Sequence, residues 1–407
     1  MKERRPFDRG LLIVAGALAA FGAIMVYSAS SAVAYTTYHD TAYFFKRELL
    51  WLAVGVIAAW LAMRMDYTRL RAAAPWIYGF AVVLLLAVVV PHVGTMEGGA
   101  QRWFSFGSFS FEPSEFAKLA LVLLLAKMFA DRADGAQSLQ RTGLPALLAV
   151  GCCFVLVMKQ PDLGTGSLMI MTALVMLYAA GAQLRHLLLE AAIALPMLAL
   201  FVFSSAYRRD RFLSFLDPWK DPQGTGYHVI QSLYALGSGG LFGVGLGASR
   251  EKFGYLPEQS TDFIFSIVGE ELGFVGAAAL VLAFLYLAYR GARIAMDADD
   301  RFGSYVATGV TASIVLQAFV NIGVAASVFP VTGVPLPFIS YGGTSLVVTL
   351  FGVGLLAGVS RGRSRAAQAA DEASQGRSVE NSARRRRHRG APLPRAVTSQ
   401  SALRRAR

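Results

Sequence analysis

Apolar runs recur along almost the whole chain, each close to the length needed to cross a bilayer. About 20 apolar residues span the hydrocarbon core as a helix. We expect such helices at residues 11–33, 48–63, 75–91, 114–130, 143–159, 164–181, 187–205, 262–289, 304–329 and 343–359. Only 16% of the 407 residues are charged, whereas a soluble domain carries about 25%. The sequence therefore predicts an all-α polytopic membrane protein with about ten transmembrane helices.

Basic residues divide the connections between these spans into two sets. One set is rich in Lys and Arg and includes both chain ends, residues 1–10 and 361–407, whereas the opposite short connections hold few. Because Lys and Arg accumulate in short cytoplasmic loops, we expect a plasma-membrane domain over residues 11–360 with both termini in the cytoplasm. The tail 361–407 is Arg-rich and contains no aromatic residue. This composition favours a disordered segment that contacts membrane lipids and argues against nucleic-acid binding.

One connection, about residues 206–261, is much longer than the others and lies outside the cell in this topology. Its middle part, Tyr227–Gly247, is apolar and glycine-rich, which favours a short helix at the membrane interface. The segment Arg250–Glu258 follows a run of glycines. We interpret it as a movable lid and assign Lys252 and Glu258 a structural or gating role.

Several charged residues fall near the outer ends of the predicted spans. They are Lys46, Arg47, Arg102, Glu115, Lys118, Asp162 and Asp262. Each has a simple structural explanation, such as an ion pair between Glu115 and Lys118 at helical spacing or a helix cap at Asp262. Lys46 and Arg47 also suit contact with lipid phosphates. Together at one membrane level, however, cations and carboxylates suit a ligand that carries phosphates and sugar hydroxyls.

Two adjacent carboxylates, Glu270 and Glu271, lie within the predicted span 262–289. A charged side chain at the bilayer centre costs about 2.5–3.5 kcal/mol. If this span is one straight helix, Glu270 lies eight residues beyond Asp262 and about 12 Å deeper. We therefore interpret Glu270 and Glu271 as residues that hold helices together or gate a cavity, and Asp262 as the carboxylate at the outer rim.

A set of ordered segments carries a resemblance to a known family. The segments are Gly99–Trp103, Pro113–Lys118, Gln160–Thr165, Asp217–Trp219, Leu256–Glu258, Thr261–Phe265, Gly269–Gly273 and Pro337–Ser345. They resemble the SEDS family (shape, elongation, division and sporulation), whose members are polytopic enzymes that polymerise peptidoglycan glycan strands. The resemblance extends over residues 10–360 and leaves only the Arg-rich tail outside.

The resemblance implies a peptidoglycan glycosyltransferase that uses lipid II. In this reaction the 4-hydroxyl of one lipid-linked sugar attacks the anomeric carbon of another, the undecaprenyl diphosphate leaves, and a β-1,4 link forms with inversion. It implies Asp262 as the general base and places Glu115, Lys118 and Asp162 in the cavity that binds the substrate. From their charge and membrane level, Lys46, Arg47 and Arg102 are candidates for phosphate contacts. We expect no tightly bound cofactor, although Mg²⁺ or Mn²⁺ beside the diphosphate is compatible with this chemistry.

Within the family, the segment Ser249–Glu258 is most similar to the division member. This implies septal cell-wall synthesis with a class B penicillin-binding protein and other divisome membrane proteins. The alternatives are the elongation-type polymerase of the same family, a lipid II flippase and a non-catalytic divisome scaffold. A flippase of the common type has repeated halves and charges at the midplane, and a scaffold has no need of Asp262 and Lys118.

Overall fold

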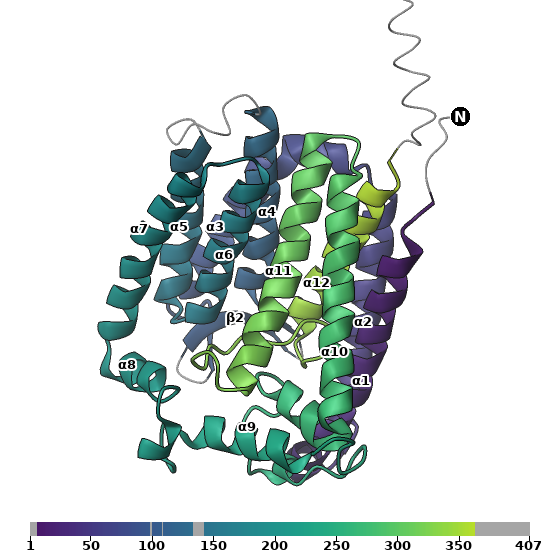
Figure 1. The fold of residues 1–407 in the computed structure, drawn as a ribbon, viewed down its shortest axis with the longest axis vertical. Coiled ribbons are helices and arrows are strands. Elements are labelled where there is room, and N and C mark those ends of the chain that lie inside the picture. The colour runs from purple at the N-terminus through teal and green to yellow at the C-terminus, as the bar shows by residue number, and fades with distance from the viewer. Residues whose placement is uncertain (1–5, 98–99, 108, 133–141, 363–407) are drawn as a thin grey trace, which may run out of the picture. The chain divides into compact units, whose positions relative to one another are not determined.

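The computed structural model describes residues 6–97, 100–107, 109–132 and 142–362, so the predictions for Gly99 and for the tail 363–407 lie outside the described residues. Long helices run side by side as a bundle (Figure 1). They are α1 (Arg9–Tyr38), α2 (Tyr43–Arg64), α3 (Tyr67–Val89), α4 (Pro113–Asp131), α5 (Leu144–Lys159), α6 (Leu163–Ala179), α7 (Leu184–Phe203), α10 (Ile264–Met296), α11 (Arg301–Ala325) and α12 (Gly343–Ser360).

Each of the predicted apolar ranges corresponds to one helix of this bundle. Among the described residues, α1, α3, α7, α10, α11 and α12 are long and apolar enough to cross a membrane, and α5 and α6 are shorter apolar helices. Lipid-facing side chains such as Trp76, Leu200 and Phe274 are exposed at the bundle surface. The chain is therefore a multi-pass membrane protein of helical fold.

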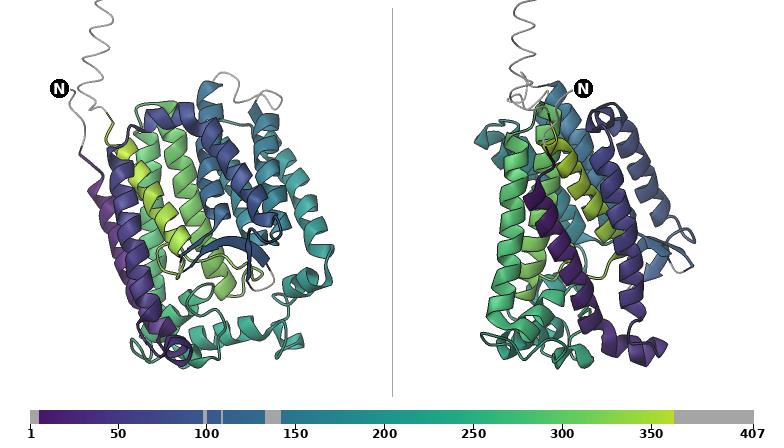
Figure 2. Two further views of the ribbon diagram at one scale, coloured as in Figure 1. Left: turned by 180° about the vertical axis from the view of Figure 1, so that it is seen from behind. Right: turned by 90° about the vertical axis from the view of Figure 1, so that its right-hand side faces the viewer.

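Both ends of the described chain lie at the same end of the bundle, which we call the terminal end. The backbone N–H of Asp8 donates to Ser360 Oγ at 3.2 Å. The Asp8 carboxylate caps α1 by accepting from Leu11 N at 2.8 Å and also pairs with Arg290 of α10. We call the opposite end, which carries the small sheet and α9, the loop end (Figure 2).

Small residues allow the helices to approach closely, as is common where helices pack in a membrane. A Cβ on Gly354 of α12 would lie only 2.4 Å from Ala59 O of α2. A Cβ on Gly22 of α1 would lie 2.0 Å from Phe338 O, in the segment before α12. These contacts place α12 and its preceding loop against α1 and α2, while α11 packs against α4, α6 and α10.

A three-stranded antiparallel sheet lies at the loop end, in the connection between the expected spans 75–91 and 114–130. Its strands are β1 (Thr95–Glu97), β2 (Ala100–Phe106) and β3 (Phe109–Phe111), in that order. Phe106 pairs with Phe109 across a tight turn in which Gly107 has a φ of 60°, as a hairpin of this length requires. Strand β2 carries Arg102, one of the expected phosphate ligands.

The long connection contains α8 (Ala206–Leu213) and α9 (Tyr227–Ser238). A helix thus forms at the start of the apolar segment Tyr227–Gly247, where the sequence favours one. It lies across the loop end of the bundle (Figure 1). Short 3₁₀ turns at Pro218–Lys220 and Glu251–Phe253 complete the connection.

The expectation of one straight helix over residues 262–289 is wrong. The helix α10 begins at Ile264 and is interrupted at Gly273, whose φ of 66° and ψ of −167° are not helical. The first part, 264–272, therefore does not continue the direction of the rest. The depth expected for Glu270 on a straight helix does not hold.

The glycine-rich loop after α9 satisfies the backbone groups that the interruption frees. Phe274 N donates to Gly240 O at 2.9 Å, and Gly245 N donates to Glu271 O at 3.0 Å. Gly243 allows this contact because its φ is 82° and a Cβ there would lie 2.1 Å from Glu271 O. The interruption thus packs directly against the long connection.

Candidate active site

Two charged side chains from distant parts of the sequence converge at the loop end. A Cβ placed on Gly333 would lie 3.6 Å from Asp262 Oδ2 and 3.9 Å from Arg102 Nη1. Arg102 comes from β2, and Asp262 lies in the turn just before α10. Gly333, in the loop between α11 and α12, has a φ of 73°. The guanidinium and the carboxylate therefore approach the same side of this glycine.

Arg102 is held in place by the short connection between α5 and α6. Its Nε donates to Gln160 O at 2.9 Å, and its Nη2 donates to Pro161 O. Its Nη1 lies 3.9 Å from Asp162 Oδ1. Asp162 is itself buried and caps α6 by accepting from Thr165 N at 3.1 Å. The side chain of Arg102 is 17% exposed, so the guanidinium is oriented by the protein and still accessible.

Glu115 and Lys118 form a buried ion pair in the first turns of α4. Lys118 Nζ lies 2.8 Å from Glu115 Oε1 and also donates to Gln317 Oε1 of α11 at 2.6 Å. The two side chains are only 3% and 6% exposed. Beside the pair lies a pocket of about 360 Å³ between α4, α11 and α12. Removing one member of a buried pair leaves an uncompensated charge. Replacement of either Glu115 or Lys118 alone should therefore destabilise the folded protein.

Two amides of α11 connect this ion pair with the Asp262 region. Gln317 Nε2 donates to Pro335 O at 2.9 Å, and Asn321 Nδ2 donates to both Val334 O and Asp262 O at 2.8 Å. They are four residues apart and therefore lie on one face of the helix. Neither amide is among the site residues predicted from the sequence, although two amides at helical spacing in an apolar span are a usable signal.

Glu112 is another site residue that the sequence analysis missed. It directly precedes α4, and its Oε1 accepts from Ser114 Oγ at 2.8 Å. Burial, together with the neighbouring carboxylates Glu115 and Asp162, raises the pKa of Glu112 to about 8, although the nearby Arg102 opposes this shift. Its position one residue before the Pro113–Lys118 segment was the available signal.

The other two predicted phosphate ligands have local partners. Lys46 is exposed, and its Nζ lies 2.8 Å from Asp40 Oδ2 in the turn before α2. Arg47 Nη1 donates to Tyr43 OH at 3.0 Å. Arg47 also lies close enough to Tyr341, just before α12, to oppose the rise in the pKa of that phenol that burial causes. No contact among the described residues brings Lys46 to Asp262, and its role as a phosphate ligand stays a prediction.

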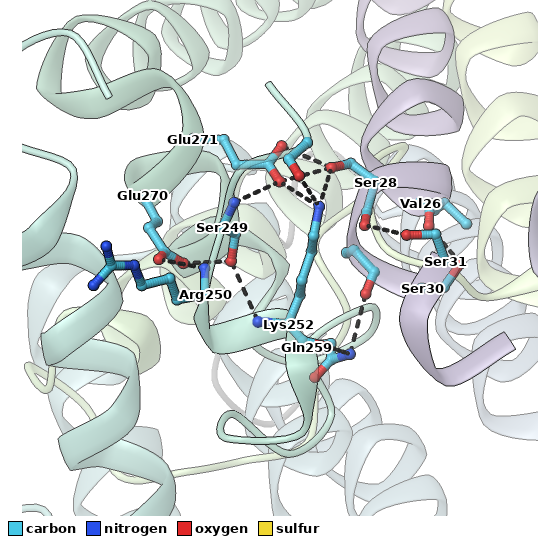
Figure 3. Close-up of polar contacts among 12 residues, drawn as sticks. Val26, Ser28, Ser30, Ser31, Ser249, Arg250, Lys252, Gln259, Glu270 and Glu271 are labelled. Atoms are coloured by element: carbon cyan, nitrogen blue, oxygen red, sulfur yellow. Dashed lines mark hydrogen bonds and ion pairs between the residues drawn. The ribbon is translucent and has the colours of Figure 1, made fainter. Parts of the chain in front are cut away.

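Glu270 and Glu271 belong to a polar network with the long connection, which we call the loop network. Its members are Ser28, Ser249, Lys252, Glu270 and Glu271 (Figure 3). Lys252 Nζ lies 3.2 Å from Glu271 Oε1, with side chains that are 4% and 0% exposed. Ser28 Oγ of α1 donates to the same carboxylate at 2.7 Å, and Ser249 Oγ donates to Glu270. The network joins α1, the long connection and the first part of α10.

The loop network bears on the segment interpreted as a lid. Lys252 fixes its beginning, and the Gln259 amide fixes its end by donating to Lys252 O at 2.8 Å and to Ala29 O at 3.1 Å. Between them, Phe253 and Tyr255 are exposed. The lid stays a prediction. Within Arg250–Glu258, the exposed part of the segment is the stretch around Phe253 and Tyr255.

Glu258 shapes the turn that leads to Asp262. It is exposed and has a φ of 53°. Its backbone carbonyl accepts from Thr261 N and Phe263 N, and its Oε2 accepts from Thr261 Oγ1 at 2.9 Å. The structure therefore gives Glu258 a local structural role next to the candidate base.

The donors around this site do not make a metal centre by themselves. Within the described residues, no group of three or more His, Cys, Asp or Glu side chains is placed to hold a metal ion. Mg²⁺ is often held by one or two carboxylates together with substrate phosphates. We therefore derive no step through a metal.

The fold and the site define a class: a polytopic helical membrane protein with carboxylates and cations gathered at one end of the bundle. A family model described as "Cell cycle protein", which covers FtsW, RodA and SpoVE, matches residues 8–365. The chain belongs to this family, which is the SEDS family that the sequence motifs indicate.

Curated relatives and a solved structure agree with this assignment. The chain is 46% identical to stage V sporulation protein E of Bacillus subtilis, with 87% of this chain and 97% of that protein covered. It is 42% identical to the probable peptidoglycan glycosyltransferase FtsW of Trichlorobacter lovleyi, with 88% and 96% covered. A chain from a structure described as "Structural coordination of polymerization and crosslinking by a peptidoglycan synthase complex" matches with a TM-score of 0.72 and 34% identity, over 88% and 99% of the two chains.

Proposed function

We propose that this protein is a peptidoglycan glycosyltransferase that polymerises lipid II into β-1,4 glycan strands. One observation carries the proposal: Asp262 Oδ2 and Arg102 Nη1 both lie within 4 Å of the point where a Cβ on Gly333 would stand, in a chain of the family to which the FtsW glycosyltransferases belong. A carboxylate can accept the proton of a sugar hydroxyl, and a guanidinium can bind a phosphate with two donors. The site thus offers both groups that transfer from a diphosphate-linked sugar requires.

In the proposed reaction, Asp262 accepts the proton of the 4-hydroxyl as this oxygen bonds to the anomeric carbon. The bond between that carbon and the diphosphate oxygen breaks, and the diphosphate keeps the electron pair. Arg102 stabilises this leaving group, and Glu115, Lys118 and Asp162 line the substrate cavity. Much of the rate comes from orientation of the two lipid-linked sugars and from charge stabilisation by fixed groups. The proposal also includes a divalent cation that binds together with the diphosphate, and no step of the reaction is assigned to it.

The cellular setting is also proposed. The basic connections favour a plasma-membrane protein with the terminal end in the cytoplasm; in this proposed orientation the candidate site faces the outer surface, where glycan strands are made. The FtsW relatives support a role in septal synthesis at cell division. The structural match to a peptidoglycan synthase complex supports a class B penicillin-binding protein as the partner that crosslinks the strands.

The test is polymerisation of labelled lipid II by the purified protein together with its penicillin-binding partner, with products separated on a gel. We expect glycan strands from the unaltered protein and from Asp210→Asn, a control at an exposed position of α8. We expect none from Asp262→Asn, although it inserts and melts like the control. Near-normal polymerisation by Asp262→Asn would refute its role as the base. An unaltered complex that makes no strands would instead favour a flippase or a scaffold.

A further inference from the structure

A cavity of about 550 Å³ lies between α5, α6 and α7, and none of its lining residues belongs to the candidate active site. Its walls are apolar and include Val150, Phe154 and Leu177. Ile193 and Met197 on its α7 side are also exposed to the bundle surface. Because this surface faces hydrocarbon in a membrane, the cavity is open to lipid.

One carboxylate lies in this apolar wall. Glu190 is 8% exposed, lines the cavity, and has a buried Oε1 that accepts no hydrogen bond from the residues that the structure describes. A buried polar group without a partner costs free energy, and a charged one costs more. Glu190 lies six residues after Leu184, the first residue of α7, which is about 9 Å along the helix. It is therefore within reach of lipid headgroups at the terminal end.

We propose that this cavity binds a phospholipid with a primary ammonium headgroup, which donates an N–H to Glu190 while an acyl chain lies against α5, α6 and α7. The bilayer supplies the occupant because the cavity opens to the lipid-facing side of α7. The carboxylate selects the headgroup, since it needs a donor and attracts a cation. A choline headgroup carries the same charge but has no N–H, so it cannot fill this role. The proposal is independent of the glycosyltransferase assignment.

The weak packing of α7 indicates what the proposed lipid would stabilise. Along the bundle α7 packs mainly against α6, and most of its apolar side chains are exposed, including Leu188, Leu195 and Leu200. An acyl chain in the cavity would add contacts between α7 and α5. Bound lipid should therefore raise the melting temperature of the protein.

Headgroup selectivity can be measured on the full-length protein in detergent by native mass spectrometry. The probes are phosphatidylethanolamine, its mono- and dimethylated forms, phosphatidylcholine and phosphatidylglycerol with identical acyl chains. We expect phosphatidylethanolamine to bind about tenfold more tightly than phosphatidylcholine, as one charge-assisted hydrogen bond allows, with the methylated forms in between. Equal binding of the two lipids, or a preference for phosphatidylglycerol, would overturn the proposal.

Two variants locate the site, and a third serves as the matched control. Glu190→Gln should keep lipid binding but lose the preference for the primary ammonium. Gly151→Leu should lose both, because Gly151 lines the cavity and a Cβ there meets no atom within 4 Å. Glu48→Gln changes another buried carboxylate with an unpartnered oxygen, on α2 outside the cavity, and should keep the preference. An unchanged preference in Glu190→Gln, or full lipid binding by Gly151→Leu, would contradict the assignment.

Discussion

The ion pair between Lys252 and Glu271 makes a quantitative prediction about the loop network. Both side chains are almost completely buried, and their charged atoms lie 3.2 Å apart. Removal of one partner from a buried pair costs about 3–5 kcal/mol, because the other charge stays buried and uncompensated. Lys252→Met leaves Glu271 with Ser28 Oγ at 2.7 Å, and Glu271→Gln leaves Lys252 with Gly247 O at 2.6 Å. We therefore expect each single variant to lie at the lower end, about 3 kcal/mol.

The double variant, Lys252→Met with Glu271→Gln, isolates the interaction energy between the two side chains from their interactions with other residues. With both charges removed, the uncompensated charge disappears, so the double variant should cost clearly less than the sum of the single ones. We expect a coupling of about 2 kcal/mol, within the usual range for contacting residues. Lys220→Met, at an exposed lysine of the same connection, is the matched control and should change stability by less than about 0.5 kcal/mol.

The assay is thermal unfolding in detergent, supported by denaturant titration where the transition is reversible. A loss of about 3 kcal/mol corresponds to a fall in Tm of about 3–4 °C in a chain of this size. Additive single and double variants would show that the pair contributes no coupling. Singles that melt like Lys220→Met would refute the claim that the network fixes the long connection to α10.

Three further predictions concern single residues. The pKa of Glu112 is raised from 4.5 to about 8 in the folded protein, so its contribution to stability is fully present below about pH 4.5 and is lost as the pH rises through 8. Glu112→Gln should therefore raise Tm at pH 8 by several degrees and change it little at pH 4.5. Equal effects on Tm at both pH values would contradict the shift. Gly243→Ala should cost about 2 kcal/mol or more, since its Cβ would lie 2.1 Å from Glu271 O, and an unchanged Tm would refute the close approach. Asn321→Leu removes the hydrogen bond to Asp262 O and should lower polymerisation at least tenfold in the folded fraction, whereas normal polymerisation would show that this contact does not position the base.

The helical bundle was predictable because hydrocarbon imposes a simple requirement on sequence. A helix that crosses it needs a long apolar run, and each expected range matches a helix. The small sheet was not predictable in the same way. Its strands are short, and the tight turn at Gly107 has no sequence signal that separates it from an irregular loop. Arg102 was found from its charge, but its orientation depends on backbone carbonyls at Gln160 and Pro161 that no sequence pattern reveals.

The candidate site was partly predictable for a related reason. Asp262, Glu115 and Lys118 stand out because charges are rare in so apolar a chain. Gln317 and Asn321 carry no charge, so a search for charged residues passes over them. Their importance comes from hydrogen bonds to segments distant in sequence, and these become visible only when the loop before α12 is in place.

The interruption at Gly273 shows how an apolar sequence window can contain two carboxylates that are buried with polar partners. Because the helix direction changes there, residues 264–272 belong with the long connection, and Glu270 and Glu271 bind Ser249 and Lys252 of that connection. The cost of burying these charges is offset by partners supplied from the loop. The same arrangement places Asp262 just before a segment that is held at both ends, by Asn321 of α11 at Asp262 O and by the loop network at Glu270 and Glu271.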